Sequence, residues 1–222
     1  TGEILWTFQT LEESKINLFT ASPVAIENIV IAPFSNGEII AFNYINGKPL
    51  WSENISKVSI ISNFDLRDIS ANPVISGNSI ISLSNNGRLI SNNVISGIRN
   101  WNIDISGSQT PIISSNQIYL VDNESRVLCI NKLSGEIYWI TQLEKYKKGS
   151  DSKNLNLWTG PYLINESLYL LSYFGELISL SPFNGEVIDK QKIGIKNIYS
   201  PIIVLSDQIF ITDEKANIYR FR

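Results

Sequence analysis

The feature that most constrains this chain is a motif of the form Gly-x-x-x-Trp that recurs along it. Four copies are complete, and a fifth keeps the glycine but has an aspartate in place of the tryptophan. The copies are Gly2–Trp6, Gly47–Trp51, Gly97–Trp101, Gly135–Trp139 and Gly185–Asp189. Self-similarity at a period of about 20 to 50 residues is typical of folds in which each unit buries its apolar face against the next. The motif therefore predicts a row of about five similar units.

A proline precedes each later motif at a constant distance. From this proline to the tryptophan position the interval is 28 residues in all four complete units, and a fifth proline opens the last unit. The prolines are Pro23, Pro73, Pro111, Pro161 and Pro201. The spacers between units vary in length while the units do not, which indicates a rigid scaffold that carries variable loops.

Inside each unit, short apolar runs alternate with two-residue turns. In the first unit the turns are Glu27-Asn28, Asn36-Gly37 and Asn46-Gly47. Asn-Gly pairs between alternating apolar runs are a strong hairpin signal. Four antiparallel strands per repeat are typical of a propeller blade. We therefore expect an all-β fold, a β-propeller of four-stranded antiparallel blades in a single domain, residues 1–222, or in an excerpt of one.

The constant spacing also sets the expected blade boundaries. The units span about residues 20–54, 70–105, 108–143, 158–192 and 198–222. The last unit has room for fewer strands, so we expect a strand from the N-terminal segment to complete it. These residues would then form either a closed five-bladed propeller or part of a larger one, and the absence of methionine from the chain favours an excerpt.

One large flat ring at a fixed place in each blade is suited to filling the wedge between successive blades. We therefore expect Trp6, Trp51, Trp101 and Trp139 to pack between blades, since buried aromatic side chains mostly supply core area. The alternative for these tryptophans is an aromatic ligand site.

Composition excludes several kinds of chemistry. The chain has no histidine, so it contains no Ser-His-Asp or Cys-His nucleophile system and no histidine-ligated zinc site. The single cysteine, Cys129, lies in an apolar run and is expected to be a buried hydrophobe. A net charge of -3 argues against nucleic-acid binding. We predict no catalytic residue, no metal site and no cofactor in this chain, and we therefore favour a binding scaffold over an enzyme, an interpretation that the family resemblance described below also implies.

Two spacers are long, residues 52–72 and 140–160, and we expect recognition to lie there, within loops 56–70 and 145–159. In the first of them Phe64 and Leu66 stand beside Arg67. An exposed apolar pair next to an arginine is suitable for a protein-binding hot spot. The alternative for Arg67 is a local ion pair with Asp65 or Asp68, which would contribute little if it is exposed.

The sequence pattern of the repeat resembles that of a known family. Units such as Pro73-Val-Ile, Asn86-Gly-Arg-Leu and Ser96-Gly-Ile-Arg-Asn-Trp are similar to pyrroloquinoline-quinone-type propeller repeats across essentially the whole chain. More narrowly, Asp68-Ile-Ser-Ala-Asn-Pro and Asn116-Gln-Ile-Tyr-Leu-Val-Asp are similar to the later blades of the BamB family. Members of that family are propeller lipoproteins of the outer-membrane β-barrel assembly machine.

This resemblance implies an eight-bladed, non-enzymatic scaffold of which the chain holds about the last five blades. Such a protein would lie at the periplasmic face of the bacterial outer membrane, attached only by a lipid anchor outside this segment. Its partners would be the periplasmic domains of the barrel insertase and unfolded barrel clients.

The resemblance also implies a docking surface of Leu, Arg and Asp residues in the inter-blade loops. In this sequence the corresponding residues are Phe64, Asp65, Leu66, Arg67 and Asp68. Asp68 matches the family pattern, and its neighbours are similar to it in type. The earlier loop, residues 17–20, lacks the arginine that the pattern places before its proline.

Two other functions remain open. Pyrroloquinoline-quinone-dependent dehydrogenases share the repeat, and resemblance to them would imply a vicinal disulfide over the quinone and carboxylates that bind calcium. This segment has neither vicinal cysteines nor a recognisable calcium motif. Their usual aspartate ahead of Thr-Gly is replaced by Asn43, Asn93 and Asn131. The other alternative is a generic propeller that serves as an interaction module.

Overall fold

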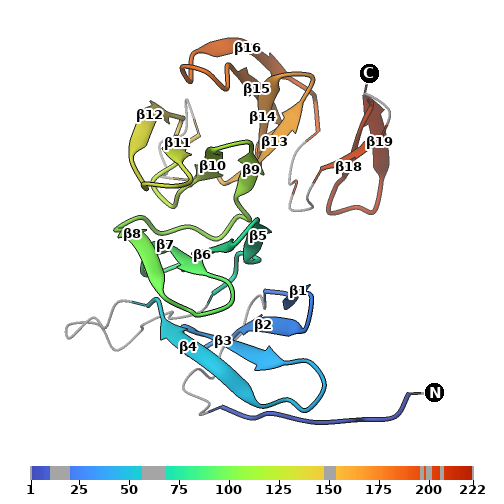
Figure 1. Cartoon of the computed structure of the whole chain (residues 1–222). Helices are drawn as coiled ribbons and strands as arrows, with labels where there is room; N and C mark the ends of the chain where they lie inside the picture. Colours follow the sequence, from blue (N-terminus) through green and yellow to red (C-terminus); the bar gives the residue numbers. More distant parts are fainter. Residues whose placement is uncertain are drawn as a thin grey trace. The chain divides into compact units, whose positions relative to one another are not determined.

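The computed structural model describes residues 2–10, 21–56, 69–147, 154–195, 198, 202–205 and 208–221. Within these ranges the regular structure consists of β-strands, arranged in four four-stranded antiparallel sheets and one three-stranded sheet (Figure 1). In each sheet the strands follow one another in chain order. The predicted fold class is therefore confirmed.

The first sheet contains β1 (Val24–Ile26), β2 (Ile29–Pro33), β3 (Glu38–Asn43) and β4 (Pro49–Asn54). The second contains β5 (Val74–Ser76), β6 (Ser79–Leu83), β7 (Leu89–Asn93) and β8 (Arg99–Ile103). The third contains β9 (Ile112–Ser114), β10 (Gln117–Val121), β11 (Arg126–Asn131) and β12 (Ile137–Gln142). The fourth contains β13 (Trp158–Ile164), β14 (Ser167–Ser172), β15 (Glu176–Leu180) and β16 (Val187–Lys192). The fifth contains β17 (Ile203–Leu205), β18 (Gln208–Thr212) and β19 (Ile218–Phe221).

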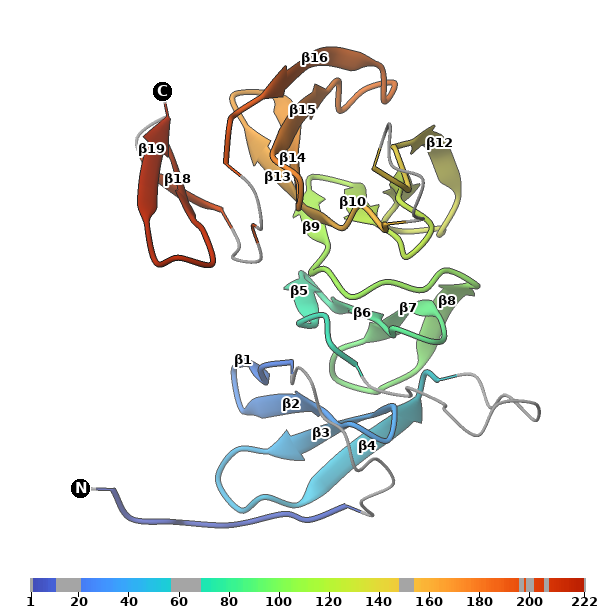
Figure 2. The same ribbon diagram turned by 180° about the vertical axis from the view of Figure 1, so that it is seen from behind.

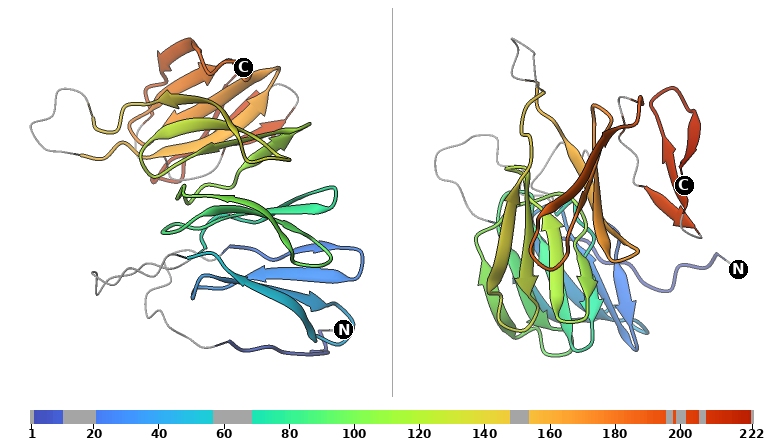
Figure 3. Two further views of the ribbon diagram at one scale, coloured as in Figure 1. Left: turned by 60° about the vertical axis from the view of Figure 1, so that its left-hand side comes forward. Right: turned by 90° about the horizontal axis from the view of Figure 1, so that it is seen from above.

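The chain forms two compact units. The first comprises Thr1–Ile113 and the turn Lys132–Gly135, and the second comprises Ser114–Asn131 and Glu136–Arg222. In the first unit the two sheets β1–β4 and β5–β8 lie face against face (Figure 3). Alternate residues of each strand point to the same face, and on the faces that meet here these residues are mostly aliphatic. The core includes Ile31, Ile39, Ile55, Ile69, Ile80 and Ile90.

In the second unit the fourth sheet lies between β10–β12 and the fifth sheet (Figure 2), and its strands β13–β15 contribute to an apolar core on each face. Leu168 and Leu170 of β14 face the core shared with β10–β12, whereas Leu171 faces the core shared with the fifth sheet. This follows from the two-residue period of a strand. Cys129 is fully buried in the first of these cores, which confirms the expectation for it. Burial raises the pKa of its thiol to about 11.

The strand register shifts at the same place in each four-stranded sheet, just before the tryptophan position. In the third sheet Cys129 pairs with Trp139 while Ile130 pairs with Ile137, so Tyr138 is left as an extra residue. A bulge of this kind re-aims the side chain of the extra residue. The equivalent residues are Leu50, Asn100 and Ile188.

Each motif tryptophan lies against a turn of the sheet that follows it. The Trp51 Nε1–H donates to the Val94 carbonyl oxygen at 3.1 Å, and a Cβ atom built on Gly97 would come within 2.5 Å of the Trp51 ring. Only glycine permits this approach at a positive φ of 72°. The same pairing joins Trp6 to Tyr44 and Gly47, Trp101 to Lys132 and Gly135, and Trp139 to Pro182 and Gly185.

Candidate partner-binding loops

Loops that leave the fourth strand of a sheet emerge at the same end as the turn between its second and third strands. This follows from the antiparallel strand order. The two long spacers of the sequence begin in this way after β4 and after β12. The predicted partner-binding residues Phe64, Asp65, Leu66, Arg67 and Asp68 lie outside the described residues, so they remain a prediction. Both ends of their loop are described.

The first loop begins and ends in the core of the first unit. Ile55 and Ile69, on either side of the loop, are buried in the same aliphatic cluster. Ser56 forms an isolated antiparallel bridge with Gly87 of the β6–β7 turn. A Cβ atom on Gly87 would lie 2.3 Å from the Ile55 carbonyl oxygen, so the close approach requires glycine. The base of the loop is thus tied to the next sheet.

Asn72 joins the entrances of three consecutive sheets of the chain. Its Oδ1 accepts a hydrogen bond from the Ser22 backbone N–H at 2.7 Å, and its own backbone N–H donates to the Thr110 Oγ1 at 3.1 Å. Each of these residues directly precedes the proline that opens its unit. Ser22 follows the loop that contains residues 17–20, and Asn72 follows the loop that contains Arg67, so one side chain fixes the ends of both predicted docking loops.

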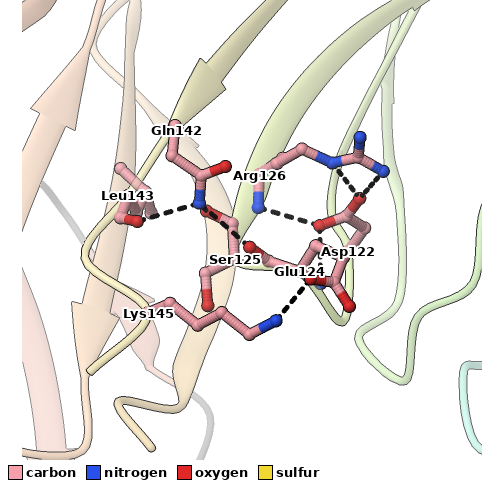
Figure 4. Close-up of polar contacts among 7 residues, drawn as sticks. All are labelled: Asp122, Glu124, Ser125, Arg126, Gln142, Leu143 and Lys145. Carbon is pink, nitrogen blue, oxygen red and sulfur yellow. Dashed lines mark hydrogen bonds and ion pairs between the residues drawn. The ribbon is translucent and has the colours of Figure 1, made fainter.

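In the second unit the base of the other long loop is a polar network on the β10–β11 turn (Figure 4). The Asp122 carboxylate is buried and accepts backbone N–H groups of Glu124 and Arg126 through Oδ1, at 2.9 and 2.8 Å. Its Oδ2 accepts from the Arg126 Nε at 2.7 Å. Charge-assisted hydrogen bonds of this kind hold the turn in one conformation.

The same turn is bound to the chain that leaves β12. The Gln142 Nε2 donates to the carbonyl oxygens of Glu124, Ser125 and Leu143, at 3.0, 3.3 and 3.0 Å (Figure 4). Lys145 forms a hydrogen-bonded ion pair with Glu124. This contact lowers the pKa of the Glu124 carboxyl and raises the pKa of the Lys145 ammonium group. The loop therefore starts from a fixed point.

Beyond this point the chain forms two paired arms, residues 144–147 and 154–158. Tyr146 and Leu155 are partners in an antiparallel bridge, and the Lys147 backbone N–H donates to the Asn154 carbonyl oxygen at 3.0 Å. The Trp158 Nε1–H donates to the Glu144 carbonyl oxygen at 3.0 Å, and the Trp158 ring is buried in the core. The ammonium group of Lys147 lies 5.0 Å from the centre of the Phe174 ring.

The arms present large apolar side chains to solvent. Tyr146 is 43% exposed, Leu155 53% and Leu157 55%. Lysine and glutamate side chains stand beside them. An apolar centre with a charged border is the usual composition of a protein-binding surface.

The sequence predicted the two loops but not the contacts that anchor them. Asn72 was part of the family-like run before Pro73, yet its hydrogen bonds join residues that are 50 and 38 positions apart in the chain. The pairing of the arms has no periodic signal either, because it consists of one isolated bridge. The one clue in the sequence is that Ser22, Asn72 and Thr110, the residues joined by these hydrogen bonds, each directly precede the proline that opens a unit.

In the described part of the chain no three His, Cys, Asp or Glu side chains are grouped so that they could hold a metal ion. Over the same residues we find no helix with the length and apolar character needed to cross a membrane.

Solved structures with this arrangement of sheets define the class of protein. The crystal structure of BamB from Moraxella catarrhalis superimposes with a TM-score of 0.80 at 16% identity, over 99% of this chain and 63% of that one. A europium-containing methanol dehydrogenase gives a TM-score of 0.65 at 11% identity, over 89% of this chain and 46% of that one. The computationally designed protein Ika8 also gives 0.65 at 11% identity, over 90% of this chain and 57% of that one. The fold is that of a β-propeller built from pyrroloquinoline-quinone-like repeats.

Within this class the sequence selects one family. The family model described as outer membrane protein assembly factor BamB matches residues 1–141, which is more than half of the chain. The chain therefore belongs to this family, as its repeats indicated. No curated protein matches the sequence itself. The chain spans under two thirds of the length of the BamB structure that it resembles.

Proposed function

We propose that this chain is part of a non-enzymatic scaffold subunit of the outer-membrane β-barrel assembly machinery. It would bind the periplasmic domains of the barrel insertase, and unfolded barrel clients, through its inter-blade loops. The observation that carries the proposal is the match of residues 1–141 to the assembly-factor family. The parent protein would be an eight-bladed propeller at the periplasmic face of the outer membrane, held there by a lipid anchor outside this segment.

The structure supports a binding role through the way in which the loops are held. Ile55 and Ile69, which flank the first loop, are buried in the core of the first unit, and the Asn72 side chain accepts a hydrogen bond from the Ser22 backbone N–H, which follows the earlier loop. Loops with fixed bases lose less conformational entropy when they bind a partner. In the second unit the exposed Tyr146, Leu155 and Leu157 offer an apolar surface on arms that are themselves anchored.

The main alternative is a fragment of a quinoprotein dehydrogenase. The similarity to a methanol dehydrogenase concerns the fold alone, because the two chains share only 11% of their residues. A titration of the full-length parent protein with pyrroloquinoline quinone and calcium tests this alternative. We expect no change in the quinone absorbance and no saturable binding, whereas a tight complex would favour the dehydrogenase.

Site-specific crosslinking tests the scaffold proposal. A photo-crosslinking amino acid would replace Arg67, and in a second variant Leu155, in the full-length parent protein expressed in its native membranes. The matched control replaces Ile95, which is exposed like Leu155 but lies in a turn between third and fourth strands, at the opposite end of its sheet.

We expect a predominant adduct with the barrel insertase from the loop variants and none from the Ile95 variant. Adducts with soluble enzymes only, or no adduct from a folded protein, would contradict the proposal. An adduct from Leu155 but not from Arg67 would move the docking surface to the arms.

A further inference from the structure

A hollow lies within the second unit, away from the loops described above. It has a volume of about 680 Å³, which is within the range of about 300 to 1,000 Å³ that is typical of small-molecule sites. It is open to solvent, and it is lined by aromatic and amide side chains at the edges of the third and fourth sheets. These residues are Asn116, Gln117, Tyr138, Trp139, Phe183 and Asn184.

Two of the aromatic side chains are not needed for packing. Tyr138 is the extra residue of the bulge in β12 and is 50% exposed, and Phe183 in the β15–β16 turn is 77% exposed. The equivalent bulge positions of the other sheets hold Leu50, Asn100 and Ile188, and the equivalent turn positions hold Ile45, Ile95 and Leu133. Among the described repeats, aromatic residues occupy both positions only at this hollow.

The bulge explains why Tyr138 can serve a ligand. A residue outside the ladder is free of the strand's inward and outward alternation, so its side chain can be re-aimed. Its hydroxyl accepts a hydrogen bond from the Asn131 Nδ2 at 2.6 Å, which fixes the ring. Beside it Trp139 is held by its own hydrogen bond to the Pro182 carbonyl oxygen at 3.1 Å.

The polar groups of the hollow are neutral amides. The Gln117 Oε1 accepts from the Tyr119 hydroxyl at 2.7 Å, and the Asn184 Oδ1 accepts from the Glu186 backbone N–H at 3.1 Å. Among the described residues the amide NH₂ groups of both side chains have no hydrogen-bond acceptor. None of the residues that line the hollow carries a charge.

We propose that this hollow binds a neutral oligosaccharide. The flat C–H face of a sugar ring would pack on Tyr138 and Phe183, and its hydroxyl or acetamido oxygens would accept hydrogen bonds from Gln117 and Asn184. A charged ligand would have no group of opposite charge to pair with in this hollow, so the desolvation of its charge would weaken binding. An extended peptide would pair with β12, which is an edge strand of the third sheet, but the two exposed rings and the two amide NH₂ groups favour a sugar, and a peptide competitor separates the two.

The test is titration of the full chain with chitohexaose, followed by isothermal calorimetry. Tyr138→Ala and Phe183→Ala are each expected to weaken binding about tenfold, since a lost aromatic contact of this size corresponds to such a factor. Leu50→Ala and Ile95→Ala change the equivalent bulge and turn positions elsewhere and are expected to leave the affinity unchanged. Tyr138→Phe keeps the ring and serves as a second variant should the alanine form fail to fold.

Saturable binding that is lost in the two aromatic variants and kept in the two controls would support the site. The proposal is overturned if neither chitohexaose nor cellohexaose binds the folded chain, or if the control variants weaken binding equally. It is also overturned if a peptide of alternating apolar residues binds at the hollow and displaces the sugar, since the site would then be one for polypeptide.

Discussion

The second unit contains two interfaces between successive sheets, and they are built differently. Between the third and fourth sheets, Trp139 of β12 reaches over to the β15–β16 turn, where it contacts Gly185 and donates to the Pro182 carbonyl oxygen. Between the fourth and fifth sheets the tryptophan position of β16 holds Asp189, and all six residues of β16 are exposed. That interface contains a cluster of buried aliphatic residues, among them Ile195, Ile198 and Ile211, with Tyr162, Tyr169, Tyr219 and Phe221 packed against it.

The difference shows what the recurring tryptophan adds. Both interfaces have an apolar core near the inner strands, so burial there does not require the tryptophan. The ring closes the outer edge, and it needs a partner turn between the third and fourth strands of the next sheet. In the fifth sheet the structure describes three strands, β17–β19, and no turn of this kind lies among the described residues. The contact therefore has two parts, the tryptophan of one sheet and the glycine turn of the next, and it requires both.

The largest effect is expected from removal of the ring. Trp139→Ala should lower the free energy of unfolding by about 3 kcal/mol, as for other large-to-small changes at packed aromatic positions. Asp189→Ala, at the equivalent place in β16, should change it by less than about 0.5 kcal/mol. Urea unfolding followed by circular dichroism measures both. Equal losses would mean that the two interfaces do not differ in the way described.

The contact between the turn glycine and the tryptophan ring can be separated from the backbone strain at the glycine. Gly185 and Gly194 have the same positive φ of 73°, but a Cβ atom on Gly185 would lie 2.5 Å from the Trp139 ring and the Thr141 Oγ1, while one on Gly194 would meet nothing within 4 Å. Gly194→Ala should cost about 1 kcal/mol from strain alone. Gly185→Ala should cost about 2 kcal/mol more, because it also displaces the ring.

Thermal unfolding of these two variants, with the double variant Gly185→Ala, Trp139→Ala as a third sample, makes the comparison sharper. Without the ring the second alanine should cost its strain and the remaining close approach to the Thr141 Oγ1, and so less than when the ring is present. If Gly185→Ala and Gly194→Ala are equally destabilising, contact with the tryptophan is not what the glycine provides.

A smaller effect is expected from the polar contact beside the ring. The Thr141 hydroxyl donates to the Gly185 carbonyl oxygen at 2.6 Å. Valine has a similar shape but no hydroxyl, so Thr141→Val should lower the free energy of unfolding by about 1 kcal/mol through the loss of this one hydrogen bond. Gln191→Ala in β16, two residues after Asp189, is the matched control and should be close to neutral. Chemical denaturation midpoints at constant m-value provide the measurement.

The turns between second and third strands should differ in their response to pH. In the fifth sheet hydrogen bonds from the Asn217 side chain and backbone lower the pKa of Asp213 to about 2, whereas the fourth sheet has Ser172 in the equivalent turn. The carboxylate thus adds stability that is complete above its ordinary pKa, near 4, and is lost as the pH falls towards 2.

Asp213→Ser, which copies the turn of the fourth sheet, should therefore remove part of the loss of stability between about pH 4 and pH 2. The effect should be small, because the group is exposed and screened by solvent. Thermal melting at several pH values in this window, for the wild type and the variant, tests it. Identical pH profiles would show that Asp213 does not contribute.

The repeat made most of the fold predictable. Fixed intervals from Pro23 or Pro73 to the tryptophan, with Asn-Gly turns between, placed the strands because each signal is local. The bulge residue Tyr138, the Asn72 hydrogen bonds and the paired arms were not predicted. Each depends on contacts between residues that are distant in the chain or on a one-residue shift in pairing, which the two-residue period does not encode. The partner-binding residues 64–68 remain a prediction from sequence.

The contact between each tryptophan and the following turn has a consequence for synthesis. Trp51 leaves the ribosome well before Gly97, so the outer strand of the first sheet cannot be locked until the next repeat has been translated. Domains made on the ribosome fold from the N-terminus as their segments emerge. A chain that emerges from its N-terminus therefore carries one unfinished outer edge until the next repeat follows, and that edge is where a chaperone would have the most influence.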